Sequence, residues 1–165
     1  IDLSRWKEAL DKGEPMDLQG FVEIIRSKNL RNAVFADVTA NDRVAQVYDQ
    51  LLSKSISVVA CNKVACSSSY DYYKKLKDLA REYNCFFQFE TNVGAGLPVI
   101  GTLNDLLRSG DTVNRIEAVL SGTLNFVFNN YNGNRSFAEV VKQAQDEGYT
   151  EPDPPLDLGG TDVMR

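Results

Sequence analysis

Residues 33–61 read AVFADVTANDRVAQVYDQLLSKSISVVAC, and this stretch decides the fold class. It contains two apolar runs, residues 33–36 and 56–61, that are too short for helices and predict buried strands. Between them, apolar side chains recur at helical spacing and predict a helix over residues 42–53. A strand, a helix and a second strand in this order are typical of a parallel sheet with a right-handed crossover.

The same alternation continues on both sides of this stretch. Helical spacing predicts helices over residues 4–10, 18–28 and 70–83, and the apolar run at residues 85–89 predicts a third strand. Because the predicted strands are largely apolar, we expect an α/β fold in which helices cover both faces of a parallel sheet.

Beyond Glu90 the pattern changes. The remaining elements that we predict are a glycine-rich joint at residues 91–98, a helix over 100–108, a strand over 113–120, a short apolar segment over 124–131 and a helix over 137–145. We therefore place a domain boundary near Glu90, which gives a first domain of residues 1–90 and a second of residues 91–165.

The composition excludes several classes of function. The 165 residues include no histidine, so this chain cannot contain a Ser-His-Asp or Cys-His catalytic group or a metal site with a histidine ligand. The net charge of −5 argues against a broad nucleic-acid-binding face, and no apolar run approaches the ~20 residues of a membrane helix. Cys61, Cys66 and Cys85 fit neither a paired framework nor a C-x-x-C motif, so we expect reduced thiols in a cytoplasmic protein.

Ligands of an open parallel sheet collect at the carboxyl ends of its strands. Three features lie at the ends of the predicted strands: residues 37–40, Asn62-Lys63, and Glu90 with the glycine-rich joint. Lys63 could offer a point charge to a phosphate or carboxylate, or could be a solvated loop lysine, and Thr39 could be an ordinary turn hydroxyl. The glycines after Glu90 could turn carbonyl groups outward around a hard cation, or could form a plain domain hinge.

An acidic loop near the end of the chain is the richest polar feature. The carboxylates of Glu151, Asp153, Asp157 and Asp162 fall within twelve residues, and three prolines stiffen the backbone between them. Rigid, clustered carboxylates suit a substrate ammonium group, a divalent metal or proton transfer. The alternative is a solvated surface turn with a helix N-cap at Asp157 or Thr161.

Five motifs in this order resemble homoserine dehydrogenase, and together they extend over essentially the whole chain. They are Asn62-Lys63, ETNVGAGLP at residues 90–98, LSGT at 120–123, GYTEPDP at 148–154 and, after Asp157, GTDVMR at 160–165. The opening IDLSRW at residues 1–6 and SSYDYY at residues 68–73 resemble the form that is fused behind an aspartokinase.

This resemblance implies NAD- or NADP-dependent interconversion of L-homoserine and L-aspartate 4-semialdehyde in threonine and methionine biosynthesis. It also implies a partial Rossmann-type domain followed by part of an α+β catalytic and dimerisation domain. The expected partners are a second copy of the chain, in a homodimer or larger assembly, and a possible fused aspartokinase domain.

Carried over residue by residue, the resemblance implies a cofactor site and a cation site. The residues that would face the nicotinamide half of the cofactor are Thr39, Ala40 and Lys63, of which Lys63 would also be catalytic. The groups that would hold a monovalent cation such as sodium are the carboxylate of Glu90 and the backbone carbonyls of Val93, Ala95 and Leu97.

The resemblance also implies a substrate site. Glu151 would meet the substrate ammonium group with Asp157 nearby, Asp162 would orient the hydroxyl as a second catalytic residue, and Gly148 would lie where substrate and cofactor meet.

The sequence departs from the family pattern at several points. The family's first strand and glycine-rich phosphate turn would precede Ile1, and its proton-transferring lysine would follow Arg165. Pro155-Leu156 stand where Arg-Asp is usual. We therefore expect a fragment that binds dinucleotide poorly and turns over little or no substrate by itself. The alternatives are a non-catalytic regulatory or assembly module on the same scaffold and another NAD(P)-dependent dehydrogenase.

Overall fold

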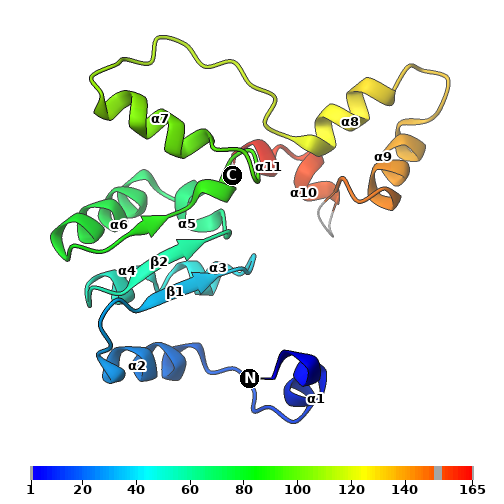
Figure 1. Cartoon of the computed structure of the whole chain (residues 1–165). Helices are drawn as coiled ribbons and strands as arrows, with labels where there is room; N and C mark the ends of the chain where they lie inside the picture. The colour runs from blue at the N-terminus through cyan, green and yellow to red at the C-terminus, as the bar shows by residue number, and fades with distance from the viewer. Residues whose placement is uncertain (1, 151–153, 165) are drawn as a thin grey trace.

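The computed structural model describes residues 2–150 and 154–164 and contains a three-stranded parallel sheet with helices packed against it (Figure 1). The strands are β1 (Val34–Asp37), β2 (Ser57–Ala60) and β3 (Phe87–Gln88), in that spatial order. In register, Phe35 lies beside Val58, and Val58 lies beside Phe87. The predicted parallel sheet is thus confirmed, with a third strand shorter than the apolar run at residues 85–89.

Helices make up most of the remaining structure. Two short 3₁₀ helices are η1 (Leu3–Arg5) and η2 (Glu90–Asn92), and the α-helices are α1 (Trp6–Asp11), α2 (Leu18–Lys28), α3 (Asp42–Ala45), α4 (Tyr48–Leu52), α5 (Val64–Ser67), α6 (Tyr70–Glu82), α7 (Val99–Arg108), α8 (Gly122–Asn130), α9 (Phe137–Asp146), α10 (Pro154–Leu158) and α11 (Thr161–Met164). The predictions for α2, α6, α7 and α9 are confirmed to within one residue at each end. In the part of the chain that the structure describes, no helix is long and apolar enough to cross a membrane.

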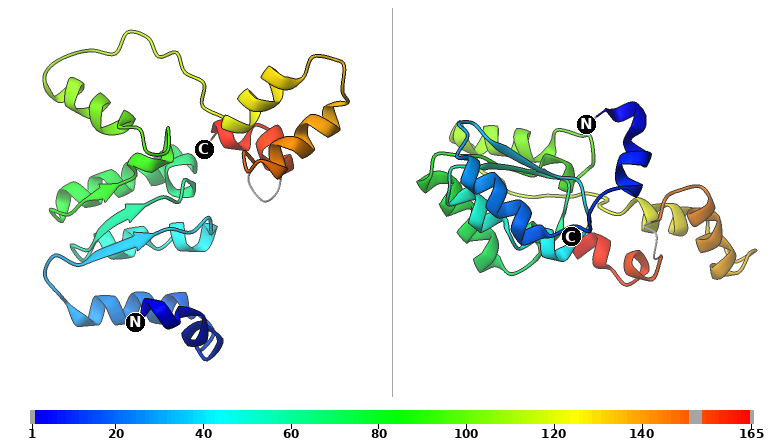
Figure 2. Two further views of the ribbon diagram at one scale, coloured as in Figure 1. Left: turned by 45° about the vertical axis from the view of Figure 1, so that its right-hand side comes forward. Right: turned by 90° about the horizontal axis from the view of Figure 1, so that it is seen from below.

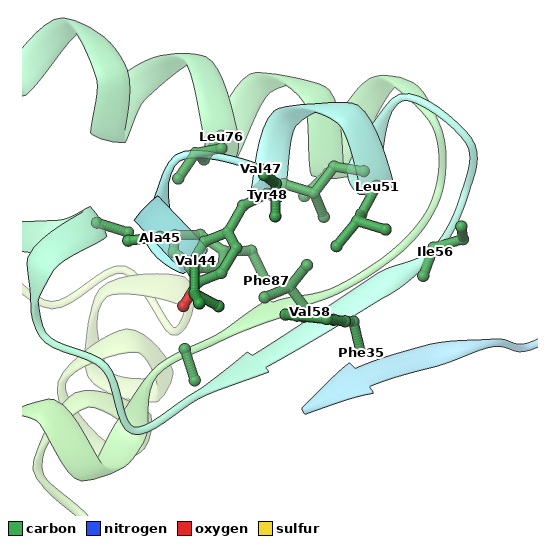
Figure 3. Close-up of a cluster of buried hydrophobic side chains, with 14 of the residues drawn as sticks. Phe35, Val44, Ala45, Val47, Tyr48, Leu51, Ile56, Val58, Leu76 and Phe87 are labelled. Atoms are coloured by element: carbon green, nitrogen blue, oxygen red, sulfur yellow. The ribbon is translucent and has the colours of Figure 1, made fainter. Parts of the chain in front are cut away.

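The main hydrophobic core lies between one face of the sheet and the helices α4 and α6 (Figure 3). Tyr48 and Leu51 of α4 and Leu76 of α6 are fully buried there against Phe35 of β1, and Val22 of α2 joins the same cluster. Full burial of an aliphatic side chain of this size stabilises a fold by roughly 1.5–3 kcal/mol. The core therefore fixes the positions of the three strands, and with them the positions of the strand ends.

A second group of helices, α8 to α11, lies to one side of the sheet and is reached through residues 109–121, which are a turn at 109–110 followed by a segment without regular secondary structure (Figures 1 and 2). Its small core joins Val127 of α8 to Val140 and Ala144 of α9. At the start of α9, Ser136 and Glu139 form a capping box, in which each side chain accepts a hydrogen bond from the other residue's backbone N–H. This group is therefore held by its own contacts as well as by its connection to the sheet.

The strand predicted over residues 113–120 is wrong. This segment is extended but unpaired, and Ile116 and Val119 are 71% and 76% exposed. Its alternating apolar residues suit a strand, but a strand also needs a neighbour for its backbone N–H and C=O groups. Within residues 2–150 and 154–164 the sheet consists of β1, β2 and β3 and offers this segment no such neighbour.

Three smaller differences have local causes. Helices were expected on both faces of the sheet, but in the described part of the chain Val34 and Val59 leave the face opposite the core exposed. The helix predicted over residues 42–53 is divided into α3 and α4, because Val47 adopts a non-helical backbone conformation. The acidic loop was expected to continue to Asp157, but α10 begins at Pro154, since proline is well tolerated in the first turn of a helix.

Candidate functional site

A cleft of about 590 Å³ lies between the carboxyl end of the sheet and the helices α8 and α11. Its walls come from four separate parts of the chain: the half-buried Lys63 after β2, residues 91–95 after β3, residues 119–122 with Asn125, and Val163 with Met164 of α11. A cavity therefore lies at the strand ends, where ligands of an open parallel sheet collect, and the binding of a ligand there stays a prediction.

Asp37, the last residue of β1, lies behind this edge of the sheet and is only 1% exposed. Its carboxylate accepts three hydrogen bonds. The Tyr48 hydroxyl donates to Oδ2 at 2.5 Å, the Asn62 amide donates to the same oxygen at 3.0 Å, and the backbone N–H of Thr39 donates to Oδ1 at 2.8 Å. A buried charge is tolerated when it is bonded in this way.

Burial acts to raise the pKa of Asp37, while the hydrogen bonds from Tyr48, Thr39 and Asn62 act to lower it. The hydrogen bonds outweigh burial, so the pKa of Asp37 lies below its ordinary value and the side chain is a carboxylate at neutral pH. Burial, followed by the hydrogen bond to this carboxylate, raises the pKa of Tyr48, so its hydroxyl remains a donor.

Asn62 joins the end of β2 to the end of β1. It is 1% exposed, and its side-chain N–H₂ donates to the backbone carbonyl of Asn41 at 3.0 Å as well as to Asp37. Its side-chain oxygen accepts the backbone N–H of Val64 at 3.1 Å. The loop that carries Thr39 and the turn that carries Lys63 are thus bonded to one buried amide.

The end of β3 joins the same arrangement through Asn92, which is 6% exposed. With the side-chain oxygen and nitrogen of Asn92 assigned so that both find partners, the amide nitrogen donates to the backbone carbonyls of Ala60 and Cys61 at 3.2 and 3.3 Å. One buried polar residue near each strand end, namely Asp37, Asn62 and Asn92, therefore connects the three ends, and we call these three residues the strand-end bracket.

Glu90 has a clear local contact. Its two carboxylate oxygens accept the backbone N–H groups of Ile100 at 2.7 Å and Gly101 at 2.6 Å, at the first turn of α7. A carboxylate is favourable there because it satisfies free N–H groups and faces the positive end of the helix dipole. A Cβ at position 101 would lie 3.0 Å from Oε2 of Glu90, which accounts for glycine at this position.

The turn after Glu90 carries the other expected cation ligands. Gly94 and Ala95 both have positive φ, 71° and 51°, and this left-handed backbone reverses the chain direction. The carbonyl of Leu97 accepts the backbone N–H of Val99 at 2.9 Å, within the same turn as Val93. Carboxylate and carbonyl oxygens are the donor set of a hard cation, so these residues fit a sodium ion chemically.

Among the residues whose side chains the structure describes, no three His, Cys, Asp or Glu side chains gather into a metal site.

The other expected cofactor residues lie in the loop after β1. Thr39 and Ala40 are exposed, and the hydroxyl of Thr39 accepts the backbone N–H of Asn41 at 3.2 Å. They lie outside the lining of the cleft, and Asn62 connects their loop to the turn of Lys63. The Thr39 hydroxyl therefore has the turn-stabilising contact that we considered for it. The bond from Asn62 also ties the Thr39 loop to the turn of Lys63.

The expected substrate residues are only partly within the described chain. Gly148 has a positive φ of 79° and ends α9, and it is exposed. Asp157 is 1% exposed, and its Oδ2 lies 2.9 Å from the Thr123 hydroxyl oxygen, which also lies 2.7 Å from the Tyr149 carbonyl. The solvated-turn alternative is wrong for Asp157, because this residue is buried within α10 and holds it against α8.

Two further predictions cannot be placed. Glu151 lies outside the described residues. The backbone of Asp162 belongs to α11, whose next two residues line the cleft, but its side chain lies outside the description. A shared position of Lys63, Glu151 and Asp162 stays a prediction.

Several residues of the site were missed by sequence reasoning. Ser121, which is buried and caps α8 by accepting the Leu124 N–H at 3.1 Å, lines the cleft together with Asn125. The roles of Asn62 and Asn92 were also missed, although both are polar residues close after apolar runs. That repeated placement is the signal that could have identified the bracket.

Comparisons with known proteins identify the family of the chain. A family model described as homoserine dehydrogenase, NAD binding domain, matches residues 3–90, and a model described as homoserine dehydrogenase matches residues 98–165. The bifunctional aspartokinase/homoserine dehydrogenase 2, chloroplastic, of Arabidopsis thaliana is 48% identical over 100% of this chain and 18% of its own length. The homoserine dehydrogenase of Schizosaccharomyces pombe is 39% identical over 100% of this chain and 45% of its own length.

Solved structures give the same result. A Candida auris protein of unknown function matches with a TM-score of 0.83 and 34% identity, over 99% of this chain and 46% of that one. A hyperthermophilic archaeal homoserine dehydrogenase in complex with NADPH matches with a TM-score of 0.76 and 31% identity, over 92% of this chain and 45% of that one. The chain thus spans less than half the length of these relatives. Since family models match both parts of it, the chain belongs to the homoserine dehydrogenase family.

Proposed function

We propose that the protein is an NAD(P)-dependent homoserine dehydrogenase, which interconverts L-homoserine and L-aspartate 4-semialdehyde, and that this chain forms the nicotinamide end of its site. The observation that carries the proposal is the cleft, in which Lys63, the glycine-rich turn after β3 and α11 meet. Family membership indicates which reaction such a cleft serves.

The residues present fit the nicotinamide half of a dinucleotide. Lys63 brings a positive charge into the cleft, and Thr39 and Ala40 lie in the adjoining strand-end loop. The chain contains no G-x-G-x-x-G sequence, so it does not itself offer that motif to the pyrophosphate. A bound nicotinamide would supply the acceptor for the hydride of the hydroxyl-bearing carbon. Lys63 would stabilise the negative charge that develops on the reacting oxygen.

The substrate would be held by acidic residues of the second helix group. In this proposal Glu151 binds the ammonium group, Asp157 lies nearby, and Gly148 leaves room where substrate and cofactor meet. Asp162 orients the hydroxyl. The burial of Asp157 against Thr123 favours a structural role for Asp157, because this contact holds α10 against α8.

We also propose a sodium ion bound by the carboxylate of Glu90 and the carbonyls of Val93, Ala95 and Leu97. The oxygen donor set and the left-handed turn support it. The test is a titration with sodium chloride in which choline chloride keeps the ionic strength constant. Sodium should raise the melting temperature of the wild-type protein, and Glu90→Gln should abolish this rise.

The wider setting is also a proposal. The relatives that combine aspartokinase and homoserine dehydrogenase support a fused aspartokinase domain. The exposed apolar Ile116, Val119 and Leu120 support a homodimer or larger assembly, which would bury them. Three free cysteines support a reducing compartment, and we propose the cytoplasm, although the Arabidopsis relative is described as chloroplastic.

Homoserine-dependent reduction of NADP⁺ or NAD⁺ by the full-length protein tests the proposed function. Lys63→Met, which removes the charge and keeps the length of the side chain, should lower kcat by about 100-fold. Lys54→Met is the matched control, because Lys54 is exposed and precedes β2 at the opposite edge of the sheet. A wild-type protein without homoserine-dependent turnover would contradict the proposal. Turnover of another small hydroxy acid in a substrate screen would then indicate a different dehydrogenase, and no turnover of any of them would favour the non-catalytic module.

A further inference from the structure

The strand-end bracket is a buried polar group that the proposed chemistry does not use directly. Asp37, Asn62 and Asn92 are each less than a tenth exposed and do not reach the bulk solvent. Buried polar groups cost free energy unless they are bonded, and apolar residues at strand ends would avoid that cost. Their presence here calls for a role that apolar side chains could not fill.

The bracket bonds to backbone groups in both loops that carry expected cofactor residues. Asp37 accepts the N–H of Thr39 itself at 2.8 Å. Asn62 accepts the N–H of Val64 at 3.1 Å, directly after Lys63, and donates to the carbonyl of Asn41 at 3.0 Å. Each bond fixes the backbone within two residues of a cofactor residue.

The bracket also connects the two loops to each other. The Asn62 amide donates to Oδ2 of Asp37 at 3.0 Å, so a shift of one loop would break a bond to the other. In the same assignment of its amide, Asn92 continues the connection through the carbonyls of Ala60 and Cys61 to the turn after β3, which also lines the cleft. These bonds therefore fix the ends of β1, β2 and β3 relative to one another.

From these contacts we infer that Asp37 and Asn62 are positioning residues, which hold the Thr39 loop and the Lys63 turn in the relative placement that hydride transfer requires. This inference rests on the proposed function. Asp37 and Asn62 act through the backbone of other residues and do not touch the reacting atoms. Because the rate of such a step depends steeply on geometry, a displacement of about 1 Å costs about 100-fold.

The test is Asn62→Ser in the full-length protein. A serine hydroxyl can still accept the N–H two residues on, at Val64, and so keeps the local turn. It is too short to reach Asp37 or the Asn41 carbonyl, so only the connection between the loops is lost. The matched control is Tyr72→Phe, which removes a hydroxyl that donates to the Ala45 carbonyl at 2.8 Å and leaves the bonds of Asn62 to Asp37 and to the Asn41 carbonyl in place.

Pre-steady-state kinetics distinguish positioning from simple stability. Enzyme is mixed with NADP⁺ in excess and saturating L-homoserine, and NADPH fluorescence is followed through the first turnover. The amplitude of this first turnover reports the competent fraction of the enzyme, and its rate constant reports the geometry within that fraction. We expect Asn62→Ser to lower the rate constant by about 10- to 100-fold and Tyr72→Phe to leave it unchanged.

A lower amplitude with an unchanged rate constant would overturn the inference, because it is the result of a purely structural role. If Asn62→Ser yields no folded protein by circular dichroism, Asp37→Asn, which keeps the volume of the side chain, is measured in the same way with the same two outcomes. A wild-type protein that shows no homoserine-dependent signal overturns the proposed function instead, and it does so before any variant is made.

Discussion

The hydrogen bond between Tyr48 and Asp37 offers a sharp test of the energetics of this fold. Tyr48 is fully buried, and its hydroxyl donates to a buried carboxylate at 2.5 Å. Tyr48→Phe removes only this hydroxyl and leaves the ring in the core. A hydrogen bond to a charged group contributes roughly 1.5–3 kcal/mol, so we expect the free energy of unfolding to fall by about 2 kcal/mol at neutral pH.

The same substitution has a predictable pH dependence. The pKa of Asp37 in the folded protein lies below its ordinary value, so its carboxylate contributes stability above the unfolded-state pKa, and this contribution is lost as the pH falls through the folded-state pKa. Removal of the Tyr48 donor leaves burial less opposed and raises that pKa. The difference between wild type and Tyr48→Phe should therefore be largest near neutral pH and smaller in acid.

Urea unfolding followed by circular dichroism, at about pH 7 and about pH 3, measures both differences. The control is Tyr72→Phe, whose hydroxyl donates to a neutral backbone carbonyl and is worth about 1 kcal/mol at either pH. An equal effect of Tyr48→Phe at the two pH values would refute the reasoning, because it would mean that Asp37 carries no charge that the hydroxyl stabilises.

Three further predictions concern other parts of the chain. Leu76→Ala should lower the free energy of unfolding, measured in urea, by about 2–5 kcal/mol, because Leu76 is fully buried and its truncation leaves a cavity. The same change at the exposed Leu30 is the control and should cost well under 1 kcal/mol. Ser136→Ala should cost about 1 kcal/mol in thermal unfolding through loss of the capping box of α9, and Ser136→Thr should restore most of it. Iodoacetamide should label the exposed Cys61 before Cys66, whose pKa is raised to about 12 by burial, and mass spectrometry of peptides would reveal the reverse order if this is wrong.

The sheet and its core could be predicted because each element carries its own signal. Phe35, Val58 and Phe87 belong to short apolar runs, and the structure puts all three side by side in the ladder. The segment at residues 113–120 gave a similar signal and was mispredicted. Alternation of apolar and polar side chains indicates that a segment has one buried and one exposed face. It does not indicate whether a second strand lies beside the segment to pair with it.

One wall of the candidate site could also be predicted, since strand ends meet at a common edge and Lys63 follows a strand directly. The opposite wall could not. Ser121 and Asn125 reach the cleft only because residues 109–121 carry the chain across to α8. Met164 reaches it because the later helices bring α11 back to the cleft. The path of a long connection depends on tertiary contacts and not on local periodicity.

The bracket shows why fold and site are coupled in this chain. In a buried network every member must be satisfied, because a partner left alone costs more than the bond contributed. Asp37 needs donors from Tyr48 and Asn62, and Asn62 in turn needs Asp37 as an acceptor. A change at one of these positions therefore destabilises the strand ends and displaces the loops of Thr39 and Lys63 together. Stability and rate should fall in parallel across bracket variants, whereas variants of the apolar core should lower stability alone.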